Sequence, residues 1–227
     1  GAGVLTLSGT NSYAGGTQVN AGTLAVSDDL NVGAVPAQVD PNNISLNGGN
    51  LRFLPGFTSL HANRGITFQA LHGTLTTDDG TDVTYHGVMS GVGNFTKAGA
   101  GSLTLNQAQA YSGTTTIAAG TLTVGDGSNT AAALSDKAIE IRGGAVLNFN
   151  HNADVAVGNA ISGDGQLNKL DAHILSLNGV NTYTGATDTG SAGGIVFTDD
   201  APPGTTGFTG AGFVTIQPHG NSFAHAV

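Results

Sequence analysis

A segment of this chain occurs more than once. Residues 99–124, GAGSLTLNQAQAYSGTTTIAAGTLTV, match residues 1–26, GAGVLTLSGTNSYAGGTQVNAGTLAV, which begin 98 positions earlier (99 − 1 = 98). A shorter copy, ILSLNGVNTYTG at 174–185, lies 72 positions beyond the second, measured from Leu103 to Leu175 (175 − 103 = 72). Internal repetition of this kind is typical of solenoids, in which each copy folds against its neighbours.

Each copy predicts three short β-strands. In 99–124 the runs SLTL and TLTV carry apolar residues two apart, which is strand alternation, and TTTI lies between them. Gly, Asn and Ser end the runs, and these residues tolerate turn geometry. Three strands and three corners make one coil of about 20–26 residues. The sequence therefore predicts an all-β fold, a right-handed parallel β-helix (three-stranded β-solenoid), with coils about 4.8 Å apart.

The spacing of the copies supports stacked coils. The two spacings differ by 26 residues (98 − 72 = 26), about the length of one coil. A solenoid accepts a whole extra coil, whereas a fraction of a coil would turn later side chains to the wrong face. We therefore predict that one common column holds the leucines of the first two copies, Leu5, Leu24, Leu103 and Leu122.

The predicted domain organisation follows the copies. We expect β-helix repeats over 1–200, with copies at 1–26, 99–124 and 174–198, and a terminal coil or cap over 201–227, where 213–216 reads as a strand. The third copy lacks the AGTL element, which predicts a distorted coil. The chain also opens in the middle of its own motif, which predicts a piece of a longer polypeptide.

One stretch, SNTAAALSDKA at 128–138, has helical propensity. It predicts either a helical turn in a corner or a plain loop.

Composition narrows the classes of partner. Only 9% of residues are charged, against about 25% in ordinary globular chains. The formal net charge is −9, and six Lys and Arg are spread along the chain, so nucleic acid and anionic membranes are poor partners. No run approaches the roughly 20 apolar residues of a membrane helix, and the absence of cysteine removes thiol chemistry.

The copies resemble the autotransporter-associated β-strand repeat of bacterial autotransporter passenger domains. Residues 1–26 carry nearly all of that pattern, including Asn11, Tyr13 and the AGTL run. In 99–124, Gln109 replaces the asparagine. The resemblance implies a passenger segment on the bacterial cell surface, exported through the outer membrane as part of a longer chain. Passengers of this family are often adhesins or self-association factors, and others are toxins or enzymes.

Acidic pairs are the main candidates for a chemical site. Calcium sites and polysaccharide-cleaving β-helices gather several carboxylates on one face, and the candidates here are Asp28, Asp29, Asp78, Asp79, Asp82, Asp199 and Asp200. We interpret them as solvated corner residues, since no EF-hand or nonapeptide calcium repeat is present. The tail carries Ser222 between His219 and His225, but without the strand-turn-helix context of a nucleophile elbow.

Two further features have structural interpretations. The glycine runs at 91–93 and 163–165 are read as corners, because a dinucleotide loop needs a following helix. Tyr13, Tyr111 and Tyr183 occupy equivalent places, and they predict corner packing rather than a ladder for stacking ligands. We accordingly predict no catalytic residues, no cofactor and no metal site.

The predicted function is a rigid stalk or adhesive surface for attachment or self-association, with a cell-surface glycan, a protein or a second copy as partner. A carbohydrate-active enzyme that uses the aspartate clusters is the main alternative, and it requires several of them to converge within about 10 Å. A pure spacer for an upstream effector domain is the third.

Overall fold

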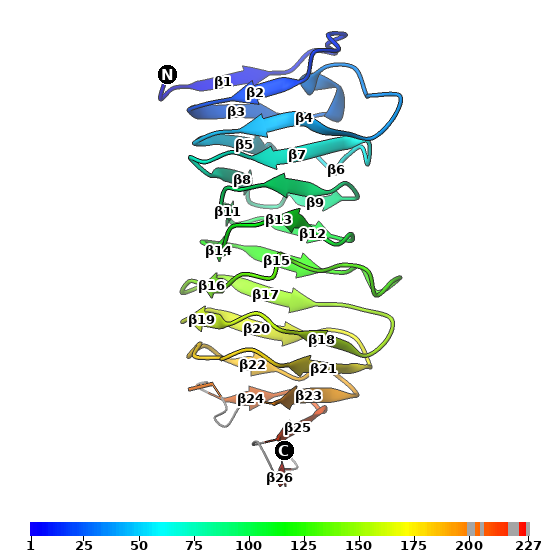
Figure 1. Cartoon of the computed structure of the whole chain (residues 1–227), viewed down its shortest axis with the longest axis vertical. Helices are drawn as coiled ribbons and strands as arrows, with labels where there is room; N and C mark the ends of the chain where they lie inside the picture. The colour runs from blue at the N-terminus through cyan, green and yellow to red at the C-terminus, as the bar shows by residue number, and fades with distance from the viewer. Residues whose placement is uncertain (199–202, 205–206, 218–222, 226–227) are drawn as a thin grey trace.

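The chain winds into a single β-solenoid of about ten coils. The computed structural model describes residues 1–198, 203–204, 207–217 and 223–225. Figure 1 shows the strands stacked one above another, with β1 at one end of the rod and β26 at the other. Within the coils that pair, the strands run parallel, which confirms the predicted fold class.

Each full coil contributes one strand to each of three faces. The first face is an eight-stranded sheet made of β1 (Val4–Leu7), β3 (Gly22–Val26), β5 (Gly49–Phe53), β8 (Gly73–Thr77), β11 (Phe95–Ala98), β14 (Thr115–Ile117), β16 (Ile139–Ile141) and β19 (Ile161–Gly163). The second face is an eight-stranded sheet made of β6 (Ser59–Leu60), β9 (Asp82–Tyr85), β12 (Ser102–Leu105), β15 (Thr121–Val124), β17 (Val146–Phe149), β20 (Gln166–Lys169), β22 (Thr187–Asp188) and β24 (Phe208–Thr209).

The third face is divided into two five-stranded sheets. One holds β2 (Thr17–Val19), β4 (Asp40–Leu46), β7 (Arg64–Phe68), β10 (Met89–Gly91) and β13 (Ala110–Tyr111). The other holds β18 (Val155–Val157), β21 (Ile174–Leu177), β23 (Gly194–Phe197), β25 (Phe213–Ile216) and β26 (Phe223–His225). Residues 125–138 cross the break between them as a loop with one isolated bridge, from Ala108 to Ala133.

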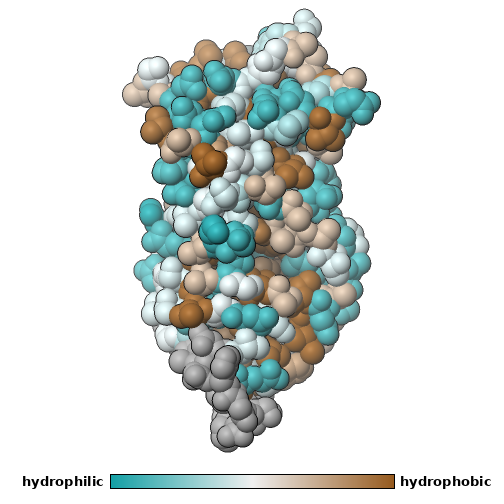
Figure 2. Space-filling model, viewed as in Figure 1, coloured by the Kyte–Doolittle hydropathy of each residue, from teal (hydrophilic) through white to brown (hydrophobic). Residues whose placement is uncertain are grey.

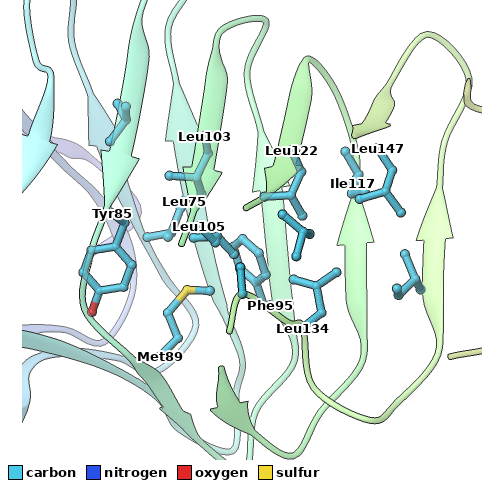
Figure 3. Packing of buried hydrophobic residues seen from close by; sticks show 14 of the residues in the cluster. Leu75, Tyr85, Met89, Phe95, Leu103, Leu105, Ile117, Leu122, Leu134 and Leu147 are labelled. Carbon is cyan, nitrogen blue, oxygen red and sulfur yellow. The ribbon is translucent and has the colours of Figure 1, made fainter. Parts of the chain in front are cut away.

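The core lies inside the rod and is built largely from alternate residues of the strands. In β12 and β15 the buried residues are every second one, and Leu103 stacks on Leu122 in register. Figure 3 shows these leucines and their neighbours on successive strands pointing into one shared interior. Because each coil buries only a few apolar residues, the hydrophobic stabilisation comes from contacts between coils.

The repeat copies do not lie on the same face. The first copy begins on the first face with β1, and four ladder steps along that sheet reach β11, whose next strand is β12. The second copy therefore begins four coils and one face later. Three ladder steps from β12 reach β20, and the third copy begins with the next strand, β21, on the third face. Each spacing thus holds whole coils plus one face, and the two spacings differ by one coil, as the 26-residue difference predicts.

The predicted common column is correct only in part. Leu24, Leu103 and Leu122 are buried in one hydrophobic cluster, but Leu24 belongs to the first face and the other two to the second. Leu5 pairs with Leu24 in register, yet it is 60% exposed because β1 is the edge strand of its sheet.

One local expectation needs correction, and the structure decides one alternative left open at 128–138. The third copy keeps a variant of the AGTL element, AGGIVF at 192–197. Strand β23 pairs with β21 in unbroken register, so this coil is not distorted. A single extra residue before Gly193 hides the match, since Thr115 and Gly120 are five apart and Thr187 and Gly193 are six apart. The stretch 128–138 is a plain loop, and the short 3-10 helix lies at Asp29–Val32 instead.

Candidate functional site

The outer surfaces of the first and second faces carry ladders of mostly uncharged polar side chains. On the first face the paired half-buried positions are Thr23, Asn50, Thr74, Thr96, Thr116, Glu140 and Ser162. On the second face they are Thr84, Thr104, Thr123, Asn148, Asn168 and Asp188. Two of these side chains link along the ladder: Asn168 Nδ2 donates to Asn148 Oδ1 at 3.0 Å. Figure 2 shows such hydrophilic side chains mixed with small apolar patches along one side of the rod.

A tyrosine and a threonine pair at the middle corner of every repeat. The hydroxyls of Tyr13 and Thr17 lie 2.8 Å apart, and the equivalent pair in the third copy, Tyr183 and Thr187, has the same separation. In the second copy Tyr111 pairs with Thr115 at 2.5 Å. Tyr111 and Tyr183 are buried, and burial raises the pKa of Tyr183 to about 12. The three tyrosines lie on different faces and form no ladder, so they pack the corners as predicted.

A loop follows each of the first two repeats and covers the corner that holds the tyrosine and threonine pair. After the first copy, residues 27–39 fold over Tyr13, whose carbonyl accepts a hydrogen bond from Ala34 N at 2.9 Å. After the second copy, Gln109 N donates to Ala133 O at 2.9 Å, and Ser135 Oγ donates to Gly113 O at 2.8 Å. Each loop takes the place of the strand that the next face would otherwise receive. Because the copies advance by one face, the two loops emerge at different corners of the rod.

Polar side chains beneath these loops hold them against the core. Arg64 is fully buried, and its guanidinium donates to Gly33 O at 2.7 Å and forms an ion pair with Asp29 at 2.8 Å. Under the second loop the shorter Asn159 has this role, donating from Nδ2 to the carbonyls of Ser135 and Lys137 at 2.6 Å each. The sequence pattern of the repeats gives no sign of Arg64, because it lies outside them.

Two buried lysines precede the second and third repeats. Lys97 Nζ lies within hydrogen-bond distance of four carbonyl oxygens, including Gly101 O at 2.9 Å, and burial lowers its pKa to about 8. Lys169 donates to Ala192 O at 2.8 Å, and burial lowers its pKa as well, although the nearby Asp171 opposes that shift. These lysines close a corner from the inside and do not face solvent.

Four of the predicted acidic candidates, Asp28, Asp29, Asp78 and Asp82, serve local structure, and Asp79 is exposed. Asp28 caps the 3-10 helix by accepting from Leu30 N at 2.8 Å, and Asp78 forms a two-bond ion pair with Arg52 at 2.7 and 2.9 Å. Asp82 accepts a hydrogen bond from the hydroxyl of Ser102. The two groups lie at different coils, and no set of three or more His, Asp or Glu side chains suited to a metal ion is found among the described residues.

Other candidates lie at the end of the chain. Asp199, Asp200, His219 and Ser222 fall outside the described residues. The backbone of His225 lies in β26, which pairs antiparallel with β25. The glycine runs at 91–93 and 163–165 form the corners that follow β10 and β19, as predicted.

An unpredicted polar cluster of His86, Asn106 and Asp126 lies at a corner of the second face. Asn106 Nδ2 donates to Asp126 Oδ2 at 3.0 Å and lies 2.8 Å from His86 Nδ1. Hydrogen bonds from Ser128, followed by that from Asn106, lower the pKa of Asp126 to about 2. The three residues are 20 apart in sequence, one coil each, which is a signal that a coil-by-coil alignment could have found.

The fold defines the class of this protein: a β-solenoid whose repeats build successive corners of a rod. The passenger-associated-transport-repeat family matches residues 1–26, 95–124 and 167–193, the three segments that the structure places at these corners. A relative, the adhesin BmaC autotransporter of Brucella suis biovar 1 (strain 1330), is 40% identical over 121 residues, which is 53% of this chain. The chain spans about 3% of that protein's length. No solved structure matches the chain significantly.

These matches make the chain similar to autotransporter passengers, the class of protein that is exported through the outer membrane to the cell surface. Within the described part of the chain, no helix is long and apolar enough to span a bilayer.

Proposed function

We propose that this segment is a rigid element of a surface passenger and that its polar sheet faces mediate attachment or self-association. The observation that carries the proposal is the pair of continuous ladders on the first and second faces, where threonine, asparagine and serine dominate. Hydroxyl and amide groups in a flat, repeated array can exchange hydrogen bonds with a glycan, a protein or a second copy of the same rod.

The scarcity of charge supports this role. Soluble proteins usually carry charges of both signs over their surface, and these charges oppose association. Here the first-face ladder carries one charged residue, Glu140, between Thr116 and Ser162. The similarity to a protein named as an adhesin points the same way.

Catalysis finds less support. Asp28, Asp29, Asp78 and Asp82 are engaged in a helix cap, in ion pairs and in a corner hydrogen bond, at separate coils. We therefore propose no enzymatic activity, cofactor or metal site for the segment. A glycan, a surface protein or a second copy remains the proposed partner.

Surface display tests the proposal. Cells that display residues 1–227 should clump, or attach to glycan- or matrix-coated plates, more than cells with the display scaffold alone. The double variant Thr74→Lys with Thr116→Lys should abolish the gain, because it places two cations on the first-face ladder. Thr58→Lys with Thr114→Lys adds the same charges at exposed corners and should leave it unchanged.

Each alternative predicts a different result. A pure spacer gives no attachment in any variant, although the segment is folded and displayed. A carbohydrate-active segment releases sugar from a polysaccharide panel and loses that activity in Asp78→Asn.

A further inference from the structure

A pocket opens where the third face is interrupted. It lies between the loop 125–138 and the strand β18, has a volume of about 300 Å³, and reaches the core at Val124 and Ile139. This volume is at the lower end of the range for small-molecule sites. It is also about twice the 150 Å³ of an engineered protein cavity that binds benzene.

The walls of the pocket are mixed: Thr130, Asp154 and Asn159 line its polar part, and the rest is apolar and partly planar. Ala132 and Leu134 line it from the loop, and Val155 and Val157 from β18. Phe149 and His151 form one wall with their rings nearly parallel, at 23° and a centroid distance of 6.3 Å. Such a wall favours a flat ring over a branched aliphatic ligand.

One buried polar atom in this wall has no partner. His151 is 3% exposed, and its Nε2 lies 3.0 Å from the carbonyl oxygen of Ala132. A carbonyl only accepts, so Nε2 carries the proton and Nδ1 of the neutral ring is an acceptor. Nδ1 is buried and finds no hydrogen-bond donor in the protein. A buried acceptor without a donor is costly, so a ligand that supplies one is favoured.

The first loop provides an internal comparison. There the long side chain of Arg64 lies beneath the loop and donates to the carbonyls of Val32, Gly33 and Ala34. Beneath the second loop Asn159 makes the corresponding contacts with a shorter side chain, and it also lines the pocket. The space is therefore a property of this corner, not of the fold.

We propose that this pocket binds a small aromatic molecule with one hydroxyl group, a simple phenol, whose ring lies against Phe149 and whose hydroxyl donates to His151 Nδ1. This site is independent of the ladders to which attachment is assigned above.

Fluorine NMR on the folded segment tests the proposal with 4-fluorophenol and fluorobenzene as the two probes. 4-Fluorophenol should bind saturably at one site. Fluorobenzene, which lacks the donor, should bind about three- to tenfold more weakly, the loss of one hydrogen bond. Equal affinity for the two probes, or no saturable binding of 4-fluorophenol, would overturn the proposal.

Two variants locate the binding. Val157→Phe fills the pocket and should abolish binding of both probes, and binding that survives in this folded variant contradicts the site. His151→Phe keeps a ring but removes the acceptor, so the affinity for 4-fluorophenol should fall to that of fluorobenzene. His61→Phe, a change at a histidine of another coil that does not line the pocket, is the matched control and should leave both affinities unchanged.

Discussion

At the scale of single residues, the middle corner of each repeat carries a pair of hydrogen-bonded hydroxyl groups, which is buried in the second and third copies. The tyrosine hydroxyl at each middle corner is placed against a threonine four residues later, in all three copies. The sequence predicts a packing role for these tyrosines because they recur at equivalent places. It does not predict the partner, since a spacing of four has no special meaning in a strand.

Loss of the tyrosine hydroxyl should therefore cost most where the pair is buried. Tyr111→Phe leaves Thr115 without its partner in the core, and we expect the free energy of unfolding in urea to fall by about 1–2 kcal/mol. Tyr13→Phe removes the same hydrogen bond at a corner where the ring is 40% exposed, and it should change stability by less than about 0.5 kcal/mol. Equal losses in the two variants would contradict a role that depends on burial.

The buried lysine at position 97 predicts a pH dependence. Burial holds its pKa at about 8, below the ordinary 10.5, so between these values the folded chain binds fewer protons than the unfolded chain. Stability must then rise with pH in this window. Relative to Lys97→Met, the wild type should gain roughly 2–3 kcal/mol between pH 8 and 10.5. Urea unfolding of both proteins measures this difference in the free energy of unfolding. A difference that stays constant or falls with pH would contradict a lowered pKa of Lys97.

At the scale of elements, the strand that closes each repeat starts at a glycine pressed against the previous coil. A Cβ at Gly120, which has φ +66°, would lie 2.3 Å from the carbonyl oxygen of Gly99. Gly22 and Gly193 occupy the same place in the other copies and have the same clash. The repeat therefore needs glycine here both for its backbone angle and for the spacing between coils.

Replacement of this glycine should be far more harmful than replacement of a glycine at a free corner. Gly120→Ala combines an unfavourable backbone angle with a clash against backbone, and we expect a loss of at least about 3 kcal/mol. Gly144→Ala has a similar φ, +78°, but an open surrounding, and should lose about 1–2 kcal/mol. Thermal unfolding of the two variants compares them, and similar losses would mean that the spacing between coils does not depend on this residue.

Strands were easier to predict than the loops that join them. Alternation of apolar residues locates strands such as β5 and β8, because every strand presents one side to the same core. The loops 27–39 and 125–138 carry no periodic pattern, and their positions depend on distant residues such as Arg64 and Asn159. A propensity argument could therefore not decide between helix and loop at 128–138.

At the scale of the whole molecule, each copy of the repeat begins a whole number of coils plus one face after the previous copy. The predicted solenoid is correct, and so is the one-coil difference between the two spacings. The advance of each copy by one face was not predicted, because all three faces bury alternate residues in the same core and a strand fits any of them. The polar ladders escaped prediction for the same reason: they depend on which strands become neighbours.

Removal of a whole coil should be tolerated, and removal of half a coil should not. Phe95 pairs with Thr115, so residues 95–114 form one coil of 20 residues (115 − 95 = 20). Deletion of 95–114 joins β10 directly to β14 and preserves the order of faces, whereas deletion of 95–104 does not. We expect a cooperative urea transition and a β-sheet circular dichroism spectrum only for the first. The same behaviour in both deletions would contradict the stacked-coil architecture.

The register between coils is the central claim, and engineered disulfides test it on all three faces. The wild-type chain has no cysteine, so each pair is unambiguous. The paired positions are Thr76 with Ala98, Thr104 with Thr123, and Ser176 with Val196. Cysteines at these pairs lie on adjacent strands about 4.8 Å apart, within reach of a disulfide. A shift of two residues along one strand, as in Thr104 with Thr121, places them about 8 Å apart and out of reach.

Mild oxidation should close all three registered pairs and none of the shifted ones, as measured by intact mass after thiol labelling. A face whose registered pair stays open, or a shifted pair that closes as readily, would contradict the account.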